Sequence, residues 1–143
     1  MPVKDELAKV FNLFHRTMFG ITKGKGVLGR AGGMPAVKLV TTGRRSGKPR
    51  PTMLTSPRQD GDIVYLVASW GGDDRHPMWY LNLRDNPEVT LTMDGKEWTA
   101  NAQTLSADEK AEVWPDITAR YKNYAGYQEK TDREIPVVRC TPV

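Results

Sequence analysis

The chain has 143 residues, of which 38% are hydrophobic, and 21 Lys and Arg against 17 Asp and Glu give a formal net charge of +4. This length predicts one domain spanning residues 1–143, which can bury roughly two-thirds of its unfolded surface. No apolar run approaches a membrane span and the first residues lack the layout of a signal peptide, so we expect a cytoplasmic protein. The single cysteine, Cys140, excludes an internal disulfide and a cysteine-based zinc or iron–sulfur site within one chain.

The charge is unevenly distributed along the chain. Residues 1–50 contain eleven Lys and Arg but two acids, for +9, whereas residues 51–143 contain ten Lys and Arg and fifteen acids, for −5. A basic half predicts an acidic partner, which could be nucleic acid, anionic lipid or a polyanionic small molecule. Nucleic acid fits poorly, because no helix-turn-helix or zinc-finger pattern occurs and Lys23, Lys25 and Arg30 have no interleaved aromatic residues.

The first 34 residues predict a helix followed by a loop. Apolar residues recur at helical spacing from Val3 to Met18 and predict an amphipathic helix that ends near Gly20. Six glycines between Gly20 and Met34 predict a basic, Gly-rich loop. The basic helix could lie peripherally on an anionic membrane, or it could pack its apolar stripe on the domain.

Six apolar stretches predict strands, and Asp60-Gly61-Asp62 and Asp94-Gly95-Lys96 carry the Asp-Gly signature of tight hairpins. The stretches are Ala36–Thr42, Pro51–Ser56, Ile63–Ser69, Val89–Met93, Lys96–Thr104 and Ile135–Cys140. Strands joined mainly by hairpins, with few covering helices, indicate an α+β fold. We expect a small six-stranded antiparallel barrel with an N-terminal helix and peripheral helices.

Helix signals follow the third strand. Pro77 suits a first helical turn, and the helix continues from Met78 through Leu83 until Asn86-Pro87 stops it. Ser106 and Glu109 form a capping box, and the helix they begin runs to Trp114, where Pro115 predicts a break or a new first turn. Short helical segments are expected within residues 121–130.

The turn between the first two strands concentrates positive charge. Arg44, Arg45, Lys48 and Arg50 lie among ten residues that also include two glycines. Glycines let the backbone bend and present its N–H groups, while the cations add charge-assisted donors. The segment therefore predicts a site for a phosphate or several carboxylates, and an ordinary solvated basic hairpin turn remains the alternative.

Three further clusters could build a cofactor site, although Met78, Trp79 and Leu81 of the second could equally be core residues and the tyrosines of the third a surface stripe that packs on the barrel. Ala68–Gly72 ends an apolar strand, and its Ser69 could donate a hydrogen bond to a ring carbonyl. Pro77–Asn82 begins a helix whose free N–H groups suit an anion or a polarised carbonyl. Tyr121, Tyr124 and Tyr127 recur every three residues and so share one side of a helix.

Catalytic signatures are otherwise few. His15 and His76 have no metal spacing, Asp73-Asp74 is typical of a solvated turn, and Cys140 lies in an apolar strand as a buried small hydrophobe. We therefore expect no metal site, and a bound cofactor would have to supply the reactivity of an enzyme.

Taken together, these clusters resemble the deazaflavin-dependent nitroreductase family. The matching pieces are Thr42–Arg50, Ala68-Ser69 with Gly71-Gly72, Pro77–Leu83 with Asn86-Pro87, Trp114-Pro115, the three tyrosines, Thr131–Arg133 and Ile135–Val137. They occur in order over about residues 36–142. The resemblance implies a split β-barrel of the FMN-binding-like superfamily that uses reduced coenzyme F420, an 8-hydroxy-5-deazaflavin, to reduce activated C=C bonds, quinones or nitroaromatics.

The resemblance also implies site residues. The coenzyme phosphate would be held by Arg44, Arg45, Ser46 and Arg50, with Thr52 and Leu54 on the next strand. The deazaflavin ring would be bordered by Val67, Ala68, Ser69 and Trp70 on one side and by Met78, Trp79, Tyr80 and Asn82 on the other. Tyr124 would touch both ring and substrate, and Ser69 and Tyr124 are the expected catalytic hydroxyls. From charge alone, Lys23, Lys25 and Lys48 are candidates for the oligoglutamate tail.

The sequence departs from the nitroreductase pattern around the substrate. Thr55 replaces a tyrosine, Trp70 replaces a lysine and Lys130 replaces a tryptophan, and these positions, with Tyr121 and Tyr127, border the expected pocket. Coenzyme binding is thus expected with a different small-molecule electrophile. The alternatives are an FMN-dependent oxidoreductase on the same barrel and a non-catalytic protein that binds F420; the oligomeric state is open.

Overall fold

The computed structural model describes residues 30–31 and 33–143. The expected N-terminal helix, His15, Lys23 and Lys25 lie outside the described residues. The strands are β1 (Arg30–Ala31), β2 (Met34–Thr42), β3 (Pro49–Thr55), β4 (Arg58–Asp60), β5 (Ile63–Val67), β6 (Glu88–Met93), β7 (Lys96–Thr104) and β8 (Val137–Pro142). The helices are the short 3₁₀ turn η2 (Trp70–Gly72), α2 (Met78–Asp85), α3 (Ala107–Arg120) and α4 (Asn123–Glu129).

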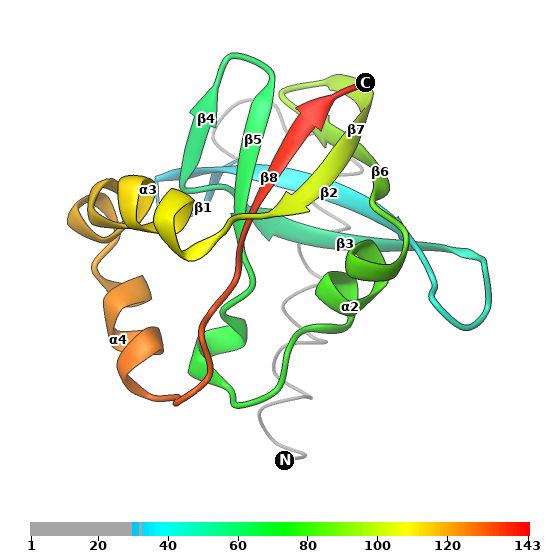
Figure 1. Cartoon of the computed structure of the whole chain (residues 1–143). Coiled ribbons are helices and arrows are strands. Elements are labelled where there is room, and N and C mark those ends of the chain that lie inside the picture. The colour runs from blue at the N-terminus through cyan, green and yellow to red at the C-terminus, as the bar shows by residue number, and fades with distance from the viewer. Residues whose placement is uncertain (1–29, 32) are drawn as a thin grey trace.

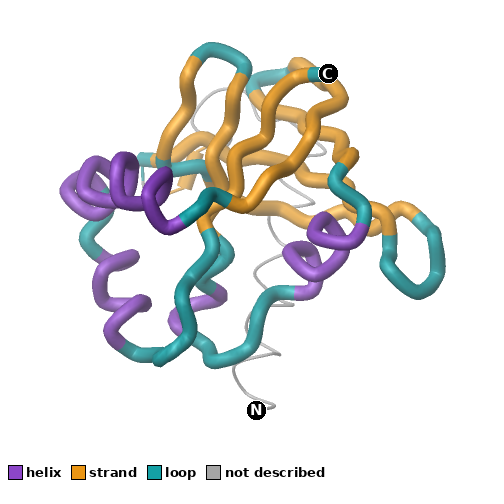
Figure 2. The backbone as a smooth tube through the Cα atoms, viewed as in Figure 1, coloured by secondary structure: helices purple, strands orange, loops and turns teal. Residues whose placement is uncertain are grey.

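The strands form one antiparallel sheet in the order β1-β2-β6-β7-β8-β5-β4, and β3 pairs with β2 (Figure 1). This confirms the α+β class. β3 and β4 are consecutive in the chain, separated by Ser56 and Pro57, although β4 ends the sheet far from β2 in strand order. The sheet therefore curls back toward itself. In the view of Figure 1 and Figure 2, α3 lies beside it at the left and α4 lies below it.

The expected count of six strands is wrong, and the pairings between described strands do not close the sheet into a barrel. The prediction missed β1 and β4, which are two and three residues long. The sequence Arg58-Gln59-Asp60 has no apolar alternation, and this strand forms because β5 offers it unpaired backbone groups. Pro57 follows β3 and has no N–H for a ladder, so strand pairing stops there.

Two apolar clusters lie on opposite faces of the central strands. Val64, Leu66 and Val138 belong to the larger cluster with Trp79 and other residues of α2 and the sheet. Tyr65 and Val137 belong to the second cluster, which lies under α3 and α4. Side chains alternate faces along a strand, so β5 and β8 need apolar residues on both faces and are read correctly as continuous apolar runs. Cys140 is fully buried in the larger cluster, as expected, and burial raises its thiol pKa to about 12.

Local signals in the sequence are confirmed where they act over a few residues. Asp94 and Gly95 adopt φ values of 53° and 79° in the hairpin between β6 and β7, as the Asp-Gly signature requires. At the start of α3, Glu109 N–H donates to Ser106 Oγ at 3.2 Å and Ser106 N–H donates to Glu109 Oε1 at 2.9 Å. This is the capping box that the sequence predicts.

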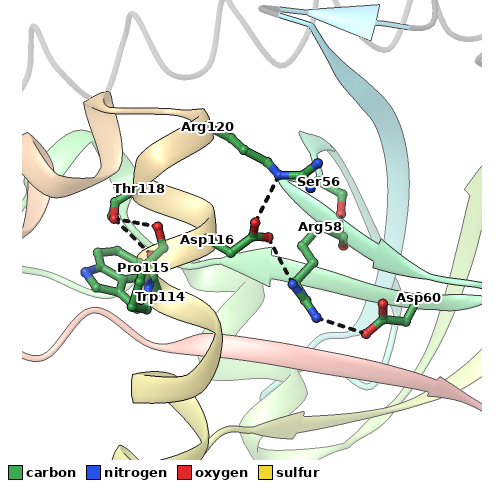
Figure 3. A network of polar contacts seen from close by, with 8 residues as sticks. All are labelled: Ser56, Arg58, Asp60, Trp114, Pro115, Asp116, Thr118 and Arg120. Carbon is green, nitrogen blue, oxygen red and sulfur yellow. Dashed lines mark hydrogen bonds and ion pairs between the residues drawn. The ribbon is translucent and has the colours of Figure 1, made fainter.

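The expected break at Pro115 is wrong, because α3 continues to Arg120. Val113 and Ile117 lie on the buried face and keep the helix packed, whereas Ala111 and Pro115 are exposed, so the hydrogen bond that the proline cannot make is lost on the solvent side of the helix. Asp116, the next residue, accepts from Arg58 Nη1 at 2.9 Å and from Arg120 Nε at 3.1 Å, which ties the helix to β4 (Figure 3).

Candidate functional site

The cationic turn between β2 and β3 is closed by its own backbone. Gly43 N–H donates to Lys48 O and Gly47 N–H donates to Gly43 O, both at 2.8 Å. A Cβ at residue 43 would lie 2.6 Å from Ser46 Oγ, so a larger residue there would displace the Ser46 hydroxyl. In Figure 1 this turn projects from the right side of the sheet, next to α2.

The turn carries positive charge that no carboxylate neutralises. Within the described part of the chain, Arg44, Arg45, Lys48 and Arg50 form no ion pair. Arg50 Nη2 donates to Ser46 Oγ at 3.2 Å, and Arg44 Nε is enclosed without a partner. An enclosed guanidinium donor beside free cations and a glycine cradle fits a phosphate oxygen. These residues therefore fit the phosphodiester of the expected coenzyme.

Asn82 on α2 stabilises this turn through two hydrogen bonds. Arg44 N–H donates to Asn82 Oδ1 at 3.1 Å, and Asn82 Nδ2 donates to Thr41 Oγ1 at 3.1 Å. The amide is 6% exposed, so its hydrogen-bonding groups serve the turn rather than a ligand ring. The sequence pointed to Asn82 but not to this role, because its partners are about 40 positions away.

Replacing Asn82 by leucine is expected to lower the free energy of unfolding by about 1–3 kcal/mol, because the half-buried Arg44 N–H loses its acceptor and the buried Thr41 hydroxyl keeps only its contact with Arg50 O at 3.5 Å. It should also loosen the cationic turn and weaken the binding of a phosphate-bearing ligand. Chemical denaturation and ligand titration measure the two effects. Asn101→Leu, at an exposed position on β7, is the matched control; equal stability of the two variants would contradict the supporting role.

The other residues of α2 expected at the site divide between solvent and core. Met78 is 58% exposed, whereas Trp79 and Tyr80 are 7% and 6% exposed and pack in the larger cluster. The Tyr80 hydroxyl lies 3.0 Å from Thr104 Oγ1 on β7. Both buried rings therefore hold α2 against the sheet, and of these three side chains Met78 is the one that a ligand can reach.

The segment after β5 has an unusual backbone. Trp70, Gly71 and Gly72 all have positive φ, at 43°, 63° and 83°. A non-glycine residue in this region costs on the order of 1–3 kcal/mol and persists only where its surroundings impose it. A Cβ at residue 72 would lie 2.9 Å from Tyr127 O, so the segment packs directly on α4.

Donors in this segment are free to meet a ligand. Ser69 is 7% exposed, and its hydroxyl has no hydrogen-bond partner among the described residues. The backbone N–H groups of Ser69, Trp70 and Gly71 likewise have no acceptor in that part of the chain. Buried N–H groups are seldom left unpaired, so this cluster of donors is suited to an oxygen that gains negative charge.

Sequence reasoning missed Arg133 as a contributor to this segment. Its guanidinium donates to the carbonyl oxygens of Ala68, Ser69 and Asp73 at 3.1, 3.0 and 2.8 Å. The sequence marked Thr131–Arg133 as a motif but offered no signal for these partners, which lie 60 or more positions away.

Thr55 and the tyrosines come together in the second apolar cluster. Tyr124 is 6% exposed, its hydroxyl donates to Met34 Sδ at 3.5 Å, and its ring meets Tyr127 edge-on with centroids 6.0 Å apart. Burial raises the pKa of Tyr124 to about 12, and a hydrogen bond with Thr55 partly opposes this rise. The phenol therefore stays protonated at neutral pH, so its hydroxyl can donate or accept a hydrogen bond or act as a weak acid.

The remaining expected residues fall around these groups. Lys130 packs against Gly72 and lies 5.7 Å from the Tyr127 ring, and Arg75 lies 4.9 Å from the Trp70 ring. Tyr121 caps α3 and is half-buried with Tyr127 at the edge of the second cluster. The expected residues Thr52, Leu54 and Val67 lie on the sheet and are half-buried. Leu54 packs against the larger cluster and Val67 against the second cluster.

The described residues contain no group of three His, Cys, Asp or Glu side chains that could hold a metal ion. His76 Nδ1 instead accepts a hydrogen bond from Arg133 Nη1 at 3.2 Å, and the centroid of its ring lies 4.9 Å from that of the Tyr80 ring. No helix in this part of the chain is long and apolar enough to cross a membrane.

Comparison with known proteins identifies relatives. A family model described as F420H(2)-dependent quinone reductase matches residues 14–142. An F420H(2)-dependent quinone reductase of Mycobacterium tuberculosis is 40% identical over 113 residues, which cover 77% of this chain and 75% of the relative. A putative second one from that organism is 32% identical over 111 residues, covering 76% of this chain and 91% of the relative.

Solved structures agree. One described as an F420-H2 dependent reductase is 39% identical, covers 74% of this chain and 93% of its own, and superposes with a TM-score of 0.67. One described as a domain-swapped dimer is 34% identical, with coverage of 90% and 96% and a TM-score of 0.69. A Clostridium acetobutylicum protein of the pyridoxinephosphate oxidase family is 14% identical over 90% of this chain and 84% of its own, with a TM-score of 0.53, and shares the fold alone.

Proposed function

Since this chain belongs to the F420H(2)-dependent quinone reductase family, we propose that it transfers a hydride from reduced coenzyme F420 to a quinone. The observation that carries the proposal is the cationic turn, with its unneutralised charges and the enclosed Arg44 Nε. A polyanionic coenzyme also accounts for the +9 charge of residues 1–50. Nitroaromatics and activated C=C bonds are the further substrate classes.

We assign the coenzyme phosphate to Arg44, Arg45, Ser46 and Arg50, and the start of the acidic tail to Lys48. The ring would lie against Ala68–Trp70, with Met78 as the α2 side chain that reaches it. Thr55, Trp70, Tyr121, Tyr127 and Lys130 would border the substrate, as the sequence suggests. We place Trp79, Tyr80 and Asn82 outside the ligand contacts. Trp79 and Tyr80 hold α2 against the sheet, and Asn82 holds the cationic turn.

The reaction requires the protein to orient the substrate and to stabilise negative charge. The bound reduced coenzyme supplies a hydride, and the quinone that accepts it becomes a hydroquinone anion that needs one proton. Ser69 Oγ–H and the free N–H groups next to it can donate hydrogen bonds to the quinone oxygen as charge develops there. The buried, protonated Tyr124 phenol is the second hydroxyl that we place near the ring, in line with its pKa of about 12.

The curled sheet is consistent with an open version of a split barrel. The likeness to the pyridoxinephosphate oxidase family protein concerns the fold alone. On that basis we propose that the fold is a split barrel. FMN is therefore the alternative cofactor in the binding test.

Parallel titrations of the purified full chain with coenzyme F420 and with FMN test the proposal, with coenzyme fluorescence as the readout. We expect saturable binding of F420 that weakens as salt is raised, since the phosphate contacts are electrostatic, and oxidation of the reduced coenzyme on addition of a quinone. Tight binding of FMN in place of F420 would keep the fold and overturn the chemistry. Binding of F420 without turnover of quinones, enones or nitroaromatics would favour a non-catalytic binding protein.

A further inference from the structure

Arg133 uses its whole guanidinium on a single segment of backbone. Nε donates to Asp73 O at 2.8 Å, Nη2 donates to both Ala68 O and Ser69 O at 3.1 and 3.0 Å, and Nη1 lies 3.2 Å from His76 Nδ1. The side chain thus bridges the two ends of the segment that contains Ser69 and Trp70. Burial lowers the pKa of Arg133, and the nearby Asp73 and Asp74 carboxylates oppose that effect.

The segment that Arg133 holds is the strained one. Residues 70–72 have positive φ, and Trp70 is not a glycine. Within the segment, Gly72 N–H donates to Ser69 O at 2.9 Å and Asp73 N–H donates to Trp70 O at 3.1 Å, so carbonyls turn toward Arg133 and the interior of the turn. The N–H groups of Ser69, Trp70 and Gly71 are left for a ligand. A backbone conformation of this kind needs an external support, and Arg133 supplies one.

Arg133 is itself fixed from both sides. Its N–H donates to Thr131 Oγ1 at 3.3 Å, and that hydroxyl donates to Asp74 Oδ1 at 2.7 Å. Gln128 Nε2 on α4 donates to Arg133 O at 2.8 Å, and Lys110 Nζ on α3 donates to Gln128 Oε1 at 3.2 Å. The backbone of Arg133, from which the guanidinium reaches the segment, is therefore tied directly to α4 and through Gln128 to α3.

We propose that Arg133 is a positioning residue of the reductase site: by binding the carbonyls of Ala68, Ser69 and Asp73 it sets the positions of the Ser69 donors and the Trp70 indole. The inference rests on the proposed function, in which those groups face the ring and the substrate. Arg133 has no direct part in the chemistry. A planar fork of five donors can span these carbonyls together, whereas the compact ammonium of lysine cannot.

The test compares Arg133→Lys with Arg139→Lys, the same substitution at a half-buried arginine whose partners are Gln103 and Glu109. Three readouts are needed: coenzyme F420 affinity by fluorescence, kcat and KM for a quinone, and hydrogen exchange of residues 68–75. A misplacement of ~1 Å can lower a rate by about 100-fold, so we expect Arg133→Lys to lower kcat by at least about tenfold. The affinity of Arg133→Lys for the coenzyme should stay within about threefold of the parent value. Most of the charge-assisted hydrogen bonds to the coenzyme are assigned to the cationic turn, which this substitution leaves intact.

Faster exchange of residues 68–75 in Arg133→Lys, but not in Arg139→Lys, is the expected structural signature. Parent-like kcat and parent-like exchange in Arg133→Lys would overturn the inference. If the parent chain fails to bind F420 or to reduce any quinone, the proposed function fails instead, and the exchange comparison still decides whether Arg133 holds the segment. Should Arg133→Lys not fold, His76→Phe removes one partner of the guanidinium, and an unchanged kcat and exchange in that variant would also count against the inference.

Discussion

Replacing Arg44 and Arg50 by alanine together is expected to weaken coenzyme F420 binding by about 3 kcal/mol, or about 150-fold in Kd. Arg50 Nη2 donates to Ser46 Oγ and Arg44 Nε is enclosed without a partner, in a turn whose cations form no ion pair among the described residues. A charged hydrogen bond contributes about 1.5–3 kcal/mol, and the lower end applies here because Arg50 is exposed to water. Fluorescence titration at two salt concentrations measures the loss.

A matched double variant separates site contacts from net charge. Lys96→Ala with Arg120→Ala also removes two cations, but these side chains pair with Asp62 and Asp116 away from the turn. We expect this control to keep the parent affinity within about twofold, since exposed ion pairs contribute little. Equal losses in the two double variants would mean that the coenzyme senses overall charge alone, and an unchanged affinity in the first would remove the turn from the site.

Ser69→Ala is expected to lower kcat for quinone reduction by about 10–100-fold while leaving coenzyme affinity nearly unchanged. Loss of one donor to a developing oxyanion typically costs about 100–1,000-fold, and the neighbouring backbone N–H groups would retain part of the effect. The Ser69 hydroxyl has no partner to lose among the described residues, so the fold should tolerate the change. Steady-state kinetics with the reduced coenzyme in excess measure kcat and KM.

Ser106→Ala is the control for stability, because it removes a serine hydroxyl that caps α3 and lies in none of the proposed contacts. It should lower the free energy of unfolding by about 1 kcal/mol and leave kcat unchanged. If Ser69→Ala behaves like Ser106→Ala, with lower stability and full activity, then Ser69 is a packing residue and the proton and charge must be handled elsewhere.

The sequence predicts this structure well where the signals are local. The Asp94-Gly95 turn and the Ser106–Glu109 capping box each depend on residues within three positions of one another, and both are present. The strands β5 and β8 are apolar on both faces and are found as expected. The sequence does not predict the short β4, because Arg58–Asp60 has no apolar alternation, although Asp60-Gly61-Asp62 marks its hairpin with β5. The helix α3 continues through Pro115 because its buried side, with Val113 and Ile117, packs in the second cluster.

The candidate site shows the same division. The cationic turn is visible in the sequence because its four basic residues are nearly contiguous. The roles of Asn82 and Arg133 are not, because each acts through hydrogen bonds to backbone about 40 or 60 positions away. In the sequence, Trp79 and Tyr80 fit equally well as ligand contacts and as core residues. Their burial in the larger cluster, with the Tyr80 hydroxyl next to Thr104 on β7, favours the core interpretation.

The position of β8 has a consequence for synthesis. This strand lies between β5 and β7 in the sheet, and Arg133 precedes it by only a few residues. While a ribosome is still making the chain, β5 and β7 expose two unpaired edges and the Ala68–Asp73 backbone lacks its guanidinium. The earlier hairpins can form as they emerge. The complete sheet and the segment proposed to border the ring form together, once residues 133–142 have left the exit tunnel.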